Sequence, residues 1–161
     1  MKNQIRKGLG IAAFVMIISI TQMIAQDGNY GGGRLAGAWD AAVTITNCET
    51  GAPIRTFLSL GSFNKGGTFT GITAGTPPAG RTPEVGVWRH EKADTYTLRF
   101  KAFLFDPTGN PIAYQVVTHE VILNEDNLNY TSGGGVKIYN MAGIQIATGC
   151  STAVATRMTL D

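Results

Sequence analysis

Residues 95–123 read TYTLRFKAFLF-DPTGN-PIAYQVVTHEVIL, two runs rich in β-branched and aromatic residues on either side of a short turn sequence. Both runs have the composition of strands, and neither shows the period of a helix. Residues 106–110 fit a type I turn with Gly109 in the left-handed region, so that Asp106 pairs with Asn110. This stretch predicts a β-hairpin, and it decides the fold class because the rest of the chain repeats its pattern.

The chain on both sides of this hairpin continues as strand-like runs separated by turn residues. All breaks but one suit hairpins, so successive strands should pair antiparallel, and closing the first strand on the last removes both sheet edges. The exception, residues 76–84, is either a plain rim loop, which we favour, or a lid over a barrel mouth. We expect an all-β domain over residues 38–161, an eight-stranded antiparallel up-and-down barrel, with strands at about 38–48, 54–63, 68–75, 85–91, 95–105, 111–123, 128–140 and 144–160.

The register of the hairpin predicts which side chains face the barrel interior. Pairing residue 106 with residue 110 sets Tyr96 opposite Glu120, with the even-numbered side chains inside because two basic residues of the first run point the other way. A three-residue turn at 92–94 sets His90 beside Tyr96 and Trp88 beside Leu98. The expected ligand-binding residues are Trp88, His90, Tyr96, Phe100, Tyr114 and Glu120, with Leu104 and Ile112 completing the lining.

The row formed by His90, Tyr96 and Glu120 is the one predicted group that could carry chemistry. A carboxylate beside an imidazole and a phenol can bind a polar ligand head or move a proton. The alternative is a rim network that satisfies buried polar groups. His119 is expected to point outward in this register. No hydrolase motif, metalloprotease motif or cofactor motif is present, so we assign no catalytic residue, no cofactor and no metal.

The first 25 residues have the pattern of a secretory signal peptide. Lys2, Arg6 and Lys7 precede an apolar run at 9–18, and Ala25 is the expected cleavage position. The alternative is an uncleaved anchor, but the run is shorter than the roughly 20 residues that span a bilayer. Residues 26–37 read as a flexible Gly-rich lead-in. We therefore predict a secreted or periplasmic protein with no stable membrane insertion after cleavage.

Removing the leader also changes the charge of the chain. The full sequence has 13 basic and 11 acidic side chains, and three basic ones lie in the leader, which leaves 10 minus 11, or −1. Nucleic-acid binding usually needs clustered Lys and Arg and a strongly basic domain. We therefore expect no nucleic-acid partner.

Cys48 and Cys150 fall near the two strands that should close the barrel. An oxidising compartment and two cysteines predict a disulfide, with two free buried thiols as the alternative. Setting Cys48 opposite Cys150 places Ala41 opposite Arg157 and Trp39 opposite Thr159. A zinc site is disfavoured because the cysteines and the two histidines show no ligand spacing.

Gly37-Ala38-Trp39 at the start of the first strand, together with Arg157 on the last, resembles the lipocalin/calycin pattern. The resemblance implies that Trp39 closes one end of the barrel and that Arg157 packs over it in a cation–π arrangement. Secreted barrels of the allene oxide cyclase or dirigent kind are an equally good structural likeness. Both likenesses imply an interior that can hold a small apolar molecule.

Three functions fit these observations. The first is an exported barrel that binds a small apolar ligand in the cell envelope. The second is a structural or self-assembling envelope protein with a packed barrel, and the third is a cyclase or isomerase that uses the interior. Self-association as a homo-oligomer would use apolar side chains that the register places outside, namely Phe103, Phe105, Val117, Val121, Val154 and Met158. Whether the interior is hollow separates the first function from the second.

Overall fold

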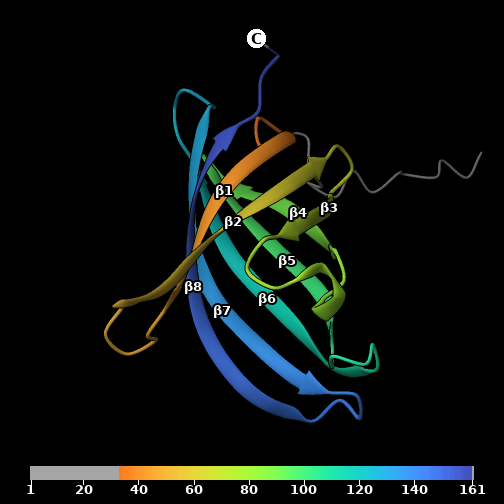
Figure 1. Ribbon diagram of the computed structural model, residues 1–161. Coiled ribbons are helices and arrows are strands. Elements are labelled where there is room, and N and C mark those ends of the chain that lie inside the picture. Colours follow the sequence, from red (N-terminus) through yellow and green to blue (C-terminus); the bar gives the residue numbers. More distant parts are fainter. Residues whose placement is uncertain (1–32, 161) are drawn as a thin grey trace, which may run out of the picture.

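The computed structural model describes residues 33–160 and shows a closed barrel in which each strand pairs with the next and the last pairs with the first (Figure 1). This confirms the predicted eight-stranded antiparallel up-and-down barrel. The predicted leader and residues 26–32 lie outside the described part of the chain. The strands are β1 Gly37–Thr46, β2 Pro53–Asn64, β3 Thr68–Thr73, β4 Glu84–Lys92, β5 Thr95–Phe105, β6 Pro111–Leu123, β7 Asn129–Asn140 and β8 Gln145–Arg157, with one 3₁₀ turn, η1 Pro78–Gly80.

The β5–β6 turn forms as predicted, but the register beyond it does not. Gly109 has φ 87°, and the Asp106 carboxylate accepts hydrogen bonds from the backbone N–H groups of Thr108 and Asn110. Phe105 pairs with Pro111, whereas the next pair is Leu104 with Ala113, because a bulge takes up one extra residue of β6. A slip of one residue turns every later side chain of a strand to the other face.

The bulge reverses the predicted orientation of β6. Tyr96 faces Val121 instead of Glu120, and Glu120 lies exposed on the outside. Tyr114 also lies outside, where its ring stacks on Tyr139 with centroids 5.1 Å apart. His119 is buried, contrary to its predicted outward position. Ile112 is exposed where an inward position was predicted, and Val117 and Val121 are buried where outward positions were predicted.

Two other register predictions concern β4 and β7. His90 pairs with Tyr96 and Trp88 with Leu98, as predicted, but the predicted three-residue turn is wrong: Lys92 pairs with Thr95, and a bulge between His90 and Lys92 gives the same register. In the sequence, Gly133–Gly135 suggest a bulge or a tight barrel corner, but these glycines pair in regular order with both β6 and β8, so no bulge forms there. The conformational freedom of the three glycines is therefore not used to break the ladder.

The β1–β8 seam carries the disulfide. Cys48 and Cys150 are bonded with their Cα atoms 5.2 Å apart, which confirms the prediction and excludes free thiols at these positions. The disulfide is compatible with an exported protein. The predicted register is wrong by two residues, because Cys48 lies beyond the end of β1 and Thr46 is the residue opposite Cys150. Trp39 is consequently opposite Arg157 itself.

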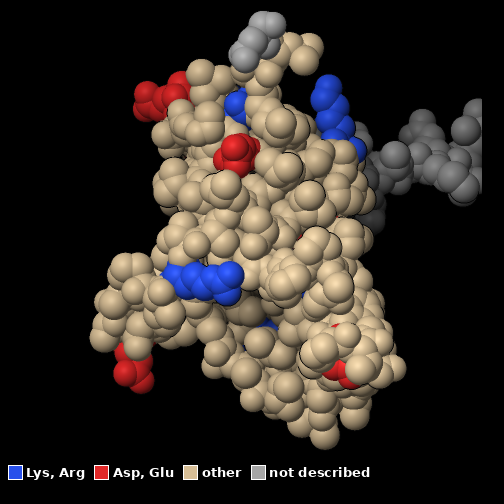
Figure 2. All heavy atoms as spheres, viewed as in Figure 1, with Lys and Arg blue, Asp and Glu red and all other residues tan. Residues whose placement is uncertain are grey.

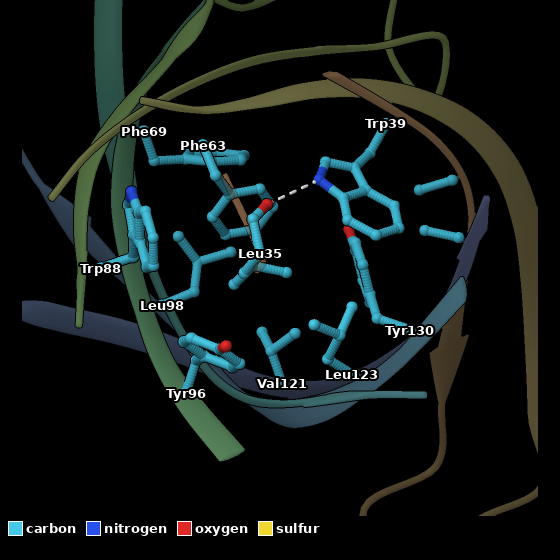
Figure 3. Packing of buried hydrophobic residues seen from close by; sticks show 12 residues of the cluster. Leu35, Trp39, Phe63, Phe69, Trp88, Tyr96, Leu98, Val121, Leu123 and Tyr130 are labelled. Carbon is cyan, nitrogen blue, oxygen red and sulfur yellow. Dashed lines mark hydrogen bonds between the residues drawn. The ribbon is translucent and has the colours of Figure 1, made fainter. Parts of the chain in front are cut away.

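One end of the barrel is closed by a cluster of buried apolar side chains (Figure 3). Leu35, completely buried, lies among them, and its carbonyl oxygen accepts the Trp39 indole N–H at 3.0 Å. Residues 33–36 are therefore fixed against the barrel rather than part of the flexible lead-in predicted for 26–37, because burial of Leu35 offsets the entropy lost on ordering. The remaining large members of the cluster are Phe63, Phe69, Trp88, Tyr96, Leu98, Val121, Leu123 and Tyr130.

The face of the barrel shown in Figure 2 has few charged groups. Basic and acidic side chains are scattered singly over the face in Figure 2, which also shows a hollow with a basic side chain beside it. Phe103, Val154 and Met158 are exposed at 38%, 61% and 55%, in agreement with the predicted outward positions. Within residues 33–160, the structure contains no helix long and apolar enough to cross a membrane.

Candidate functional site

The half of the barrel beyond the apolar cluster holds a cavity of about 240 Å³. All eight strands contribute to its wall. Much of the lining is apolar, and the cavity is smaller than the roughly 300–1,000 Å³ typical of ligand pockets. The apolar lining side chains are Ala41, Val43, Ile45, Phe57, Phe69, Leu98, Phe100, Val117, Val136 and Ala153.

Glycines on the inner face of β2 and β3 make room for larger neighbours. A Cβ at Gly61 would lie 3.0 Å from the Phe69 ring, and a Cβ at Gly71 would lie 2.7 Å from a carboxylate oxygen of Glu84. The Phe69 ring and the Glu84 carboxylate can therefore lie across these strands. The absence of side chains at these two positions leaves room for the Glu84 carboxylate inside the barrel, at the edge of the cavity.

The loop between β3 and β4 forms part of the cavity wall. The Arg55 guanidinium donates a hydrogen bond to the Gly75 carbonyl oxygen at 2.8 Å, and a Cβ at Gly75 would lie 2.7 Å from the Phe57 ring. Further along, the Thr82 N–H donates to the Phe103 carbonyl oxygen at 3.0 Å. The loop thus packs against β2 and β5, and it contributes Gly75, Thr76 and Arg81 to the lining rather than standing clear as the plain rim loop that we favoured.

A buried ion pair lies on the cavity wall. Arg81 Nη1 is 2.8 Å from Glu84 Oε1, and each side chain is 7% exposed. Burial raises the pKa of Glu84, and the neighbouring Arg81 charge opposes that rise. Burial, with a smaller effect of the Glu84 charge, also raises the pKa of the Tyr130 phenol. Two charges and a phenol thus meet inside an otherwise largely apolar barrel.

His119 forms the second polar group of the cavity wall. Its Nε2 is 2.9 Å from the Ser151 hydroxyl and its Nδ1 is 3.0 Å from the Ser132 hydroxyl. Burial lowers the pKa of His119 to about 4, so the imidazole is neutral at neutral pH. A neutral imidazole has one donor and one acceptor nitrogen, so one serine donates to the ring and the other accepts from it.

Gly134 explains how the imidazole reaches β8. Gly134 lies between His119 of β6 and Ser151 of β8 in the ladder. A Cβ at Gly134 would lie 3.0 Å from His119 Cδ2 and 2.1 Å from the Thr118 carbonyl oxygen. With no side chain at this position, the His119 ring extends across β7 and joins three strands through its hydrogen bonds.

The predicted ligand-binding residues are divided among three places. Phe100 lines the cavity, whereas Trp88 and Tyr96 belong to the apolar cluster at the closed end. His90 is half-buried beside Tyr96, and its Nε2 is 2.8 Å from the Ala93 carbonyl oxygen. Tyr114 and Glu120 lie outside, so the expected row of His90, Tyr96 and Glu120 does not form. The enzyme hypothesis required Glu120 beside His90 and Tyr96, and Glu120 is on the outer face of the barrel.

Trp39 and Arg157 meet at the closed end. The Arg157 guanidinium carbon lies 4.3 Å from the Trp39 ring centroid, in the cation–π arrangement that the resemblance implied. Arg157 also donates to the carbonyl oxygens of Ala36 and Asn127, each at 2.7 Å. These contacts hold the segment before β1 against the barrel.

The polar residues of the cavity were not predicted as site residues. For His119, the relative cost of burial could have identified the correct face of β6, because a buried carboxylate at Glu120 costs more than a buried neutral imidazole. For Arg81, the loop sequence gives no comparable indication. Its inward position depends on contacts with β5 that are distant in sequence.

Comparison with known proteins gives little further information. No family model matches the chain, and no curated protein matches it significantly. Among solved structures, the chain is similar to the crystal structure of Rv2717c from M. tuberculosis, with 13% sequence identity and a TM-score of 0.39. The match covers 79% of this chain and 94% of that one. A likeness of this size carries no argument about ligand or activity.

Proposed function

We propose that the protein is an exported small-molecule binding barrel that takes its ligand in the cavity of its open half. The observation that carries this proposal is the cavity itself, about 240 Å³ within a barrel whose other end is packed with aromatic side chains. A purely structural barrel gains stability by filling its interior. Instead, inward positions here are occupied by glycine, alanine and serine.

The lining favours a ligand with an apolar body and at least one polar group. Phenyl rings and aliphatic side chains form much of the wall, while the Arg81–Glu84 pair and the His119 group supply directed hydrogen bonds. Such a combination is typical of small-molecule sites. Export is part of the proposal and is supported by the leader sequence and by the Cys48–Cys150 disulfide.

Native mass spectrometry of the mature protein purified from its own host tests the proposal. We expect a bound mass that Ala153→Phe removes, because Ala153 lines the cavity and a phenyl group there fills much of it. Val43→Phe, on the facing position of β1, repeats the test at a second site. Val154→Phe places the same ring on the outside and should retain the bound mass. A bound molecule that survives both cavity variants, or wild-type protein that binds neither a host molecule nor an apolar dye, would contradict the proposal.

A further inference from the structure

Arg81 has hydrogen-bonding capacity that the described chain does not use. Its side chain is 7% exposed, and the ion pair with Glu84 uses Nη1. Nε has no hydrogen-bond partner within residues 33–160. A guanidinium carries five N–H donors in a planar fork, and leaving such donors unpaired inside a protein is costly. Because Arg81 also lines the cavity, a ligand that carries an acceptor can pair with this guanidinium.

The charges of the lining indicate the sign of that acceptor. Arg55 and Arg81 are cationic, Glu84 is the one acidic residue of the lining, and His119 is neutral at neutral pH. Even with Glu84 ionised, the wall carries an excess of one positive charge. Glu84 is 5% exposed, and burial favours its neutral, protonated form. Protonation of Glu84 removes its negative charge and therefore increases the positive excess of the wall.

We propose that the ligand is an organic monocarboxylate, with its carboxylate on the Arg81 guanidinium and its apolar body against Phe57, Phe69 and Phe100. The guanidinium fork matches a carboxylate in two parallel hydrogen bonds. A single excess charge suits a monoanion, and the cavity of about 240 Å³ suits a small body. This inference rests on the proposed ligand-binding function and names its ligand class.

Calorimetric titration at neutral pH with matched pairs of probes tests the ligand class. Hexanoate, octanoate and phenylacetate are compared with their primary amides, which have nearly the same shape but no charge. We expect the carboxylates to bind and each amide to bind roughly 10- to 100-fold more weakly, since hydrogen bonds to charged partners are the stronger ones. Inorganic phosphate should not compete with hexanoate, because it has no apolar body.

Variants then test the role of Arg81. Arg81→Gln should weaken hexanoate binding roughly 10- to 100-fold and leave hexanamide binding nearly unchanged. Because Arg81→Gln leaves Glu84 buried without its partner, the neutral double variant Arg81→Gln/Glu84→Gln provides a second version with no unpaired charge. Arg99→Gln removes the same charge from the exposed outer face of β5 and should bind hexanoate like the wild type.

The outcomes separate the two proposals. If amides bind as tightly as carboxylates, or if Arg81→Gln and the double variant bind hexanoate normally, the carboxylate inference is overturned while ligand binding in the cavity stands. Equal competition by phosphate would also overturn it. If no probe binds and the host-purified protein carries no ligand, both proposals fail together.

Discussion

The burial of His119 predicts that the protein loses stability as pH falls below neutrality. In the folded state the pKa of His119 is about 4, whereas an unperturbed histidine titrates near 6.5. The unfolded chain therefore takes up this proton first, so the stabilisation is fully present above about pH 6.5 and is lost as pH falls toward about pH 4. At roughly 1.4 kcal/mol for each pKa unit, the full loss is about 3 kcal/mol, of which about 2 kcal/mol is reached at about pH 5.

Urea unfolding of the wild type and of His119→Gln, between about pH 8 and about pH 4, measures this loss. Carboxylates also titrate over this interval, but they are common to both proteins, so the difference between the two curves isolates the imidazole. We expect the wild type to lose about 3 kcal/mol more than His119→Gln on going to about pH 4. Parallel curves for the two proteins would refute the conclusion that the imidazole is buried and neutral.

Three further predictions follow from the fold. Removing the disulfide by Cys48→Ala/Cys150→Ala should lower the free energy of unfolding in urea by about 4.7 kcal/mol, because the bond closes a loop with a sequence separation of 102 residues. A loss below about 1 kcal/mol would show that the cross-link does not constrain the unfolded chain. Gly134→Ala should destabilise the protein by about 1–3 kcal/mol, because the added Cβ clashes with the Thr118 carbonyl oxygen. Gly135→Ala has open space at its Cβ position and should be neutral or slightly stabilising. Equal effects at the two sites would refute this explanation. Leu35→Ala should cost about 2–5 kcal/mol, because Leu35 is completely buried; an unchanged midpoint would show that residues 33–36 do not hold the closed end.

The architecture could be predicted because each step depended on local sequence. Turn residues such as those at 106–110 separate the strands, and antiparallel neighbours follow from short connections. The β4–β5 pairing of His90 with Tyr96 was also predicted correctly, although a shorter turn and a bulge produce it. The disulfide followed from the number of cysteines and their positions near the first and last strands.

The site could not be predicted to the same extent, because inward and outward faces depend on single-residue register. The bulge after Phe105 adds one residue to β6, and this exchanges Glu120 for His119 inside the barrel. Nothing in the turn sequence distinguishes the bulged hairpin from the regular one. Arg81 presented a different difficulty, since its burial depends on a loop packing against strands that are distant in sequence.

The contrast between the two barrel ends has a kinetic consequence. Leu35 and the aromatic rings around it seal one end, so within residues 33–160 the cavity does not run through the barrel from end to end. Ligand exchange at the other end would pass Arg55 and the β3–β4 loop that carries Gly75, both of which line the cavity. Residence time should therefore depend on how often that loop moves away from Phe57. Substitutions in this loop can then change the association and dissociation rates of the ligand together, while the affinity stays constant.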